Sequence, residues 1–225
     1  MFELSPQDWT AIALSLRVAV VSTLIALPFG IAIATVLARA SFWGKSALDA
    51  LVHLPLVLPP VVTGYLLLVT FGRKAPVGAF LADHFGIVFS FRWTGAALAC
   101  GVMAFPLMVR AIRLSIEAVD RRLEHAAATL GANPVSTYAT VTLPLALPGI
   151  IAGMMLAFAR ALGEFGATII VAGSIPGETR TLAVAIYSLA ETGQDAQALR
   201  LVPVSMAIAF AALWTANWLA EKRAA

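Results

Sequence analysis

Five long, mostly apolar stretches restrict the fold of this chain more than any other feature. A helix needs about 20 apolar residues to cross the hydrocarbon core of a bilayer, because each residue adds about 1.5 Å. Within lipid, backbone polar groups must be bonded inside the segment, which favours helices. The predicted spans cover residues 10–38, 48–71, 93–115, 146–172 and 201–220. We therefore expect an all-α membrane protein with five transmembrane helices, forming one domain over residues 1–225.

The composition supports a membrane protein and argues against a nucleic-acid-binding one. Hydrophobic residues make up 60% of the chain and charged residues 12%, whereas a soluble domain has about 25% charged residues. Mean hydropathy is +0.90. The net charge of +3 comes from basic residues near the ends of apolar stretches, as expected for loops beside a membrane. The first stretch has no basic leader and is too long for a signal peptide, which indicates a retained span.

The distribution of basic residues predicts the orientation in the membrane. With five spans the termini lie on opposite sides, and cytoplasmic loops collect more Lys and Arg. One side has eight basic residues: Arg39, Lys45, Arg110, Arg113, Arg121, Arg122, Lys222 and Arg223. The other side has five: Arg73, Lys74, Arg92, Arg180 and Arg200. We expect a multi-pass protein of the cytoplasmic (inner) membrane, with its N-terminus outside and its C-terminus and the 116–143 loop in the cytoplasm.

The 116–143 loop is the least membrane-like part of the chain. Residues 123–130 are alanine-rich and favour a helix, and Gly131 follows where a C-cap glycine belongs. Asn133 and Pro134 then favour the start of a second short helix. Two short helices outside the membrane form a docking element rather than a pore, although an ordinary amphipathic loop helix would also fit.

This loop resembles the EAA loop of bacterial ABC importer permeases, which has a Glu-Ala-Ala helix, a glycine and a Leu-Pro that begins the next span. His125 occupies the usual glutamate position, so the role of Glu124 is open. The resemblance implies docking to cytoplasmic ABC ATPase subunits through a set of coupling residues. These are Glu124, Ala126, Ala127, Gly131, Leu143 and Pro144.

Two ionisable residues, Arg160 and Glu164, fall inside the fourth predicted span. Charged groups at membrane depth face protein or water, and i, i+4 spacing on one helix face allows the two to pair. A structural ion pair and a role in lining a pathway remain equally open. In the second span, Pro55, Pro59 and Pro60 fit either a broken helix along a central path or irregular packing. The candidate pathway residues are Thr63, Arg160, Glu164 and Thr168.

Three segments resemble the molybdate branch of these permeases, whose close relatives carry tungstate and sulfate. They are residues 54–64, 163–168 and 175–182, within a resemblance that covers about residues 10–220. The resemblance implies a type I importer permease fold and alternating access driven by separate ATPase subunits. It also implies a periplasmic or extracellular molybdate-binding protein. Because five spans enclose a pathway poorly, we expect a homodimer.

Other classes of function find little support in the residues. Gly44-Lys45-Ser46 lacks the first glycine of a phosphate-binding loop, and the three histidines lack metal-ligand spacing, so no cofactor or metal site is expected. Cys100 has no partner for a disulfide and is expected to be a packing residue. A self-sufficient channel would leave the docking loop unexplained, and an intramembrane enzyme would have only Arg160 and Glu164 as candidates. Residues 182–189 could form a short helix at the membrane interface.

Overall fold

The computed structural model describes residues 4–224, and every regular element among them is a helix. The helices are α1 (Pro6–Arg39), α2 (Lys45–Val57), α3 (Pro60–Phe71), α4 (Pro76–Phe85), α5 (Trp93–Glu117), α6 (Arg121–Thr129), α7 (Pro134–Thr137), a π-helical turn (Tyr138–Thr142), α8 (Leu143–Leu162), α9 (Gly166–Ala172), α10 (Leu182–Glu191) and α11 (Asp195–Ala224). Four helices in the described part of the chain are long and apolar enough to cross a membrane, or five if α2 and α3 form one span.

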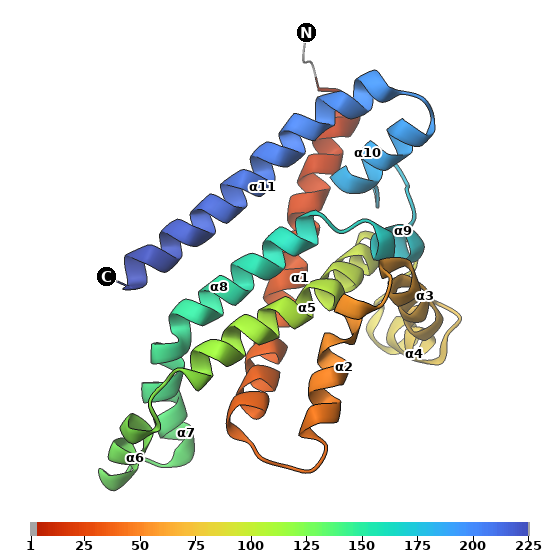
Figure 1. The fold of residues 1–225 in the computed structure, drawn as a ribbon. Coiled ribbons are helices and arrows are strands. Elements are labelled where there is room, and N and C mark those ends of the chain that lie inside the picture. The colour runs from red at the N-terminus through yellow and green to blue at the C-terminus, as the bar shows by residue number, and fades with distance from the viewer. Residues whose placement is uncertain (1–3, 225) are drawn as a thin grey trace.

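The centre of the molecule is built from α1, α5 and α8, which pack against one another (Figure 1). Their shared core contains Leu37, Met108, Ile112 and Ile150, all at most 5% exposed. Helix α11 packs along α8, while α3 and α9 pack together beside α5. Figure 1 shows α6 and α7 at the end of the molecule away from the N-terminus.

Small residues bring α8 close to α5. A Cβ on Gly153 would lie 3.0 Å from the backbone oxygen of Met108, and one on Gly149 would overlap Ser115. The Ser115 hydroxyl donates a hydrogen bond to the Ala146 carbonyl across the same contact (3.2 Å). Close packing of this kind drives helix association in membranes, where burial of apolar surface gives little advantage over lipid.

The second predicted span is divided into α2 and α3, which meet at an angle of 114°. Leu58 is extended (φ −70°, ψ 141°), and so is Pro59 (φ −54°, ψ 135°). Each precedes a proline, whose ring disfavours helical backbone in the preceding residue. The Pro59-Pro60 pair therefore breaks the helix.

The fourth predicted span also differs from a single helix over 146–172. The helical path begins earlier, at Pro134, continues through the π-helical turn into α8 and ends at Leu162. Gly163, Glu164 and Phe165 separate it from α9. The first, third and fifth predicted spans correspond to the single helices α1, α5 and α11, and residues 182–189 lie in the short helix α10.

Candidate coupling loop and translocation site

Local hydrogen bonds define the two short helices of the 116–143 loop. The Asp120 carboxylate begins α6 by accepting the Arg122 N–H (2.9 Å), and the Asn133 side chain begins α7 by accepting the Ser136 N–H (2.8 Å). Gly131 has φ +90°, and the Ala132 N–H bonds back to the Ala127 carbonyl (3.1 Å). This is the geometry of a glycine-terminated helix, as the sequence predicts.

The outer surface of this loop is open. None of the described residues of α6 is buried. Leu130 is 89% exposed and Val135 78% exposed, so two large apolar side chains face outward on either side of the glycine turn. Ala126 and Gly131 are exposed as well, and a Cβ on Gly131 would meet nothing within 4 Å. The loop thus presents a small-residue, partly apolar surface suited to a protein partner.

Glu124 points inward rather than onto this surface. Its Oε1 accepts one hydrogen bond from Arg39 Nη2 at the end of α1 (2.8 Å) and one from the Thr142 hydroxyl before α8 (2.7 Å). Nη2 of Arg39 also donates to the Val119 carbonyl (3.2 Å). Glu124 therefore ties α6 to two membrane helices. Of the two remaining loop candidates, Leu143 packs against the α1–α5–α8 core and Pro144 is exposed.

A second contact joins the loop to α1. The Tyr138 hydroxyl and Thr35 Oγ1 are 2.7 Å apart, and Thr35 also donates to the Ile31 carbonyl (2.7 Å). Since a hydroxyl has one hydrogen, Tyr138 donates and Thr35 accepts. Arg39, Thr142 and Tyr138 were not predicted as site residues, because contacts across 18, 85 and 103 residues leave no spacing signal in the sequence.

Arg160 and Glu164 form the expected ion pair, with Nη1 and Oε2 2.7 Å apart. They do not share one uninterrupted helix, because α8 ends at Leu162. Glu164 is 3% exposed, and its other oxygen accepts the N–H of Ala167 in the first turn of α9 (2.9 Å). The carboxylate thus stabilises both the end of α8 and the start of α9, where exposed N–H groups favour an anion.

The other two pathway candidates, Thr63 and Thr168, lie on the neighbouring helices α3 and α9. A Cβ on Gly64 would lie 2.8 Å from the Ala167 carbonyl, which shows how closely the two backbones approach. Thr63 is 5% exposed and Thr168 is fully buried. The Thr63 hydroxyl is buried with no hydrogen-bond partner among the described residues, whereas that of Thr168 lies 3.7 Å from Cys100 Sγ. Cys100 is a buried packing residue, as predicted.

Comparison with known proteins now decides the family. The family described as "Binding-protein-dependent transport system inner membrane component" matches residues 26–222. The chain belongs to this family. It is 56% identical over 219 residues, covering 97% of this chain and 96% of its relative, to the molybdenum transport system permease protein ModB of Escherichia coli (strain K12). It is 51% identical over 95% of its length, and 93% of the relative, to ModB of Haemophilus influenzae.

Solved structures agree on the fold of this inner membrane component. A bacterial ABC transporter involved in alginate import matches with a TM-score of 0.77 at 19% identity, covering 97% of this chain and 80% of that chain. The MetNI methionine ABC transporter matches with a TM-score of 0.67 at 16% identity, covering 96% and 93%. The chain therefore has the type I importer permease fold, and members of its family work with an ATPase and a substrate-binding protein.

Proposed function

We propose that this chain is the permease subunit of a molybdate importer. The observation that carries the proposal is 56% identity to a molybdenum permease along nearly the whole length of both chains. Tungstate and sulfate are the alternatives within the branch, because all three are tetrahedral dianions. In this proposal a molybdate-binding protein outside the membrane delivers the anion, and the permease supplies the pathway by alternating access.

The coupling surface of the proposal is the exposed loop around Gly131. Ala126 and Ala127 leave room for close approach by an ATPase subunit, while Leu130 and Val135 supply apolar contact area. Glu124 holds the loop against α1 and the start of α8, so movement of the ATPase is passed into the membrane helices. In this proposal the loop and the C-terminus lie in the cytoplasm, and the N-terminus lies outside.

The translocation pathway of the proposal runs beside α3 and α9, in a homodimer whose two-fold axis follows the pathway. Both helices follow breaks in membrane spans, and irregular backbone at membrane depth occurs where it faces protein or a water-filled path. Thr63 and Thr168 contribute hydroxyls there, and Arg160 with Glu164 holds the second break in shape.

Uptake by cells tests the substrate and the coupling loop together. Cells lacking the gene receive the wild type, Gly131→Asp or Gly193→Asp, and molybdate accumulation is measured with and without excess sulfate. Both glycines have positive φ (+90° and +72°) and open space at Cβ, so backbone strain is matched. Gly193 lies between α10 and α11, on the side assigned to the exterior.

The proposal expects uptake with the wild type and Gly193→Asp, loss with Gly131→Asp, and no competition by sulfate. Normal uptake by a well-expressed Gly131→Asp protein would contradict the coupling role. Inhibition by sulfate would assign the permease to sulfate instead, and accumulation that does not depend on the gene would reject an oxyanion of this group as its substrate.

A further inference from the structure

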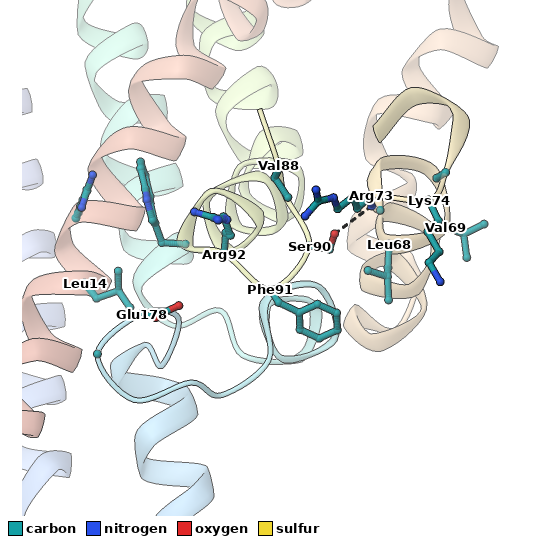
Figure 2. A pocket seen from close by; sticks show the side chains of 15 residues that line it. Leu14, Leu68, Val69, Arg73, Lys74, Val88, Ser90, Phe91, Arg92 and Glu178 are labelled. Carbon is teal, nitrogen blue, oxygen red and sulfur yellow. Dashed lines mark hydrogen bonds between the residues drawn. The ribbon is translucent and has the colours of Figure 1, made fainter. Parts of the chain in front are cut away.

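A large cavity opens where loops meet the C-terminal ends of α3 and α9. Its volume is about 1000 Å³, and it is lined by residues of α1, the end of α3, the α3–α4 turn, the segment before α5 and the loop after α9. Figure 2 shows Arg92 and Glu178 on one side of this space and Lys74 on the other. None of the coupling or pathway candidates lines it.

The cavity is strongly cationic. Its lining contains Arg17, Arg73, Lys74 and Arg92 against a single carboxylate, Glu178. Among residues 4–224, none of the four basic side chains forms an ion pair within 4.0 Å. Low-dielectric walls around charges of one sign focus the electric field and raise the local concentration of the opposite ion. Such a cavity attracts anions.

Two of the basic residues, Arg17 and Arg73, make contacts across the lining. The Arg17 guanidinium lies 3.9 Å from the centre of the Trp93 ring, a cation–π contact that leaves its charge unneutralised. The Arg73 backbone N–H donates to the Ser90 hydroxyl (3.1 Å), which joins the α3–α4 turn to the opposite loop (Figure 2). These contacts join α1 to the start of α5 and the α3–α4 turn to the segment before α5, while the four basic side chains themselves are exposed.

The cavity lies directly beyond both short helices that carry the pathway candidates. Leu68 and Gly72, at the end of α3, line it. Phe91, another lining residue, donates its N–H to the Val171 carbonyl of α9 (3.0 Å). Phe91 is the one non-glycine residue with positive φ (54°) in the described chain, a strained backbone that this bond helps to hold. An anion in the cavity thus faces the ends of α3 and α9.

We propose that this cavity receives the tetrahedral oxyanion released by the binding protein, before the anion enters the pathway beside α3 and α9. The inference rests on the proposed function and adds a binding site on the outer side of the permease. Four positive charges and a volume far larger than one small oxyanion fit a hydrated dianion held weakly and briefly. Such a site speeds transfer without trapping the anion.

The test uses the complete importer in proteoliposomes, with purified binding protein and labelled molybdate. The double variant Arg73→Gln/Lys74→Gln is compared with the wild type and with Arg200→Gln, which removes an exposed charge on the same side outside the cavity. Initial uptake rates are measured at several salt concentrations and in vesicles with and without phosphatidylglycerol. Docking of the binding protein is measured separately by surface plasmon resonance.

The expected result is an uptake rate about tenfold lower for the double variant at low salt, with a flatter salt dependence and normal rates for Arg200→Gln. Equal rates for wild type and double variant would overturn the inference. So would a loss explained wholly by weaker docking of the binding protein. A defect that follows phosphatidylglycerol content rather than molybdate would assign the charges to lipid phosphate and also overturn it. Absence of uptake by the wild type would instead reject the proposed function.

Discussion

Two Arg–Glu pairs at opposite regions of the molecule do different work. Arg39 and Glu124 are separated by 85 residues and join an exposed loop to the end of a membrane helix. Arg160 and Glu164 are four residues apart and hold a break between two helices. The side chains of the first pair are 19% and 22% exposed, whereas in the second pair Arg160 is 29% exposed and Glu164 2% exposed. The second pair therefore has a buried carboxylate, and the first has a partly exposed one.

The two glutamates have different structural roles: one fixes the position of a helix, and the other fixes the shape of a local turn. Glu124 fixes where α6 lies relative to α1 and α8, so its loss frees an element that is otherwise exposed. Glu164 fixes the backbone turn between α8 and α9 and compensates a charge at membrane depth. Removing the Glu124 carboxylate should therefore affect transport more than stability. Removing the Glu164 carboxylate should mainly lower stability.

The largest expected effect is that of Glu164→Ala. It leaves the Arg160 guanidinium without its partner and the Ala167 N–H without an acceptor, which costs about 3 kcal/mol. We expect a much lower unfolding midpoint in detergent micelles and poor expression. Glu164→Gln is the matched control, because its amide oxygen can still accept the Ala167 N–H, and it should lose less. Equal stability of Glu164→Ala and the wild type would remove the contrast between the pairs.

Glu124→Ala should have an intermediate effect on stability and a large one on transport. Loss of partly exposed hydrogen bonds to Arg39 and Thr142 costs about 1 kcal/mol. Because α6 is no longer held, uptake and substrate-stimulated ATP hydrolysis should fall while the thermal midpoint shifts only slightly. A double-mutant cycle with Arg39→Gln tests whether Glu124 acts through Arg39, because substitutions of two residues in direct contact have non-additive effects. Fully additive losses would mean that Glu124 acts on the ATPase rather than through Arg39.

Tyr138→Phe should have the smallest effect. It removes the hydroxyl that donates to Thr35, a single neutral hydrogen bond worth about 1 kcal/mol. We expect uptake within about a factor of two of the wild type, because the Glu124 contacts remain. Thr35→Val deletes the same bond from the other side and should match it, with no further loss in the double variant. A loss of uptake as large as that of Glu124→Ala would make the tyrosine the main tether.

Local sequence signals predicted the elements that depend on local causes. Apolar length predicted α1, α5 and α11, and the Pro59-Pro60 pair accounts for the break before α3. Gly131 predicted the end of α6 and Asn133 the start of α7, and local hydrogen bonds form at both positions.

Features that depend on contacts between distant segments had no local signal in the sequence. The break at Gly163 has no proline, and depends on the Glu164 cap and on the close approach of α9 to Gly64. Arg73, Lys74 and Arg92 were counted only for membrane orientation and Arg17 was not used, because chain order does not reveal that these residues share a space. The tether of Glu124 to Arg39 belongs with these, since it crosses 85 residues.

The helical path from Pro134 to Leu162 has a mechanical consequence. Its 29 residues form a lever about 40 Å long, with the tethered loop at one end and the Glu164 turn at the other. If such a lever tilts by about 10° around its middle, each end moves by about 3.5 Å, roughly the reach of one hydrogen bond. A tilt of this size at the loop end would therefore move the end beside α9 far enough to exchange one set of polar contacts for another.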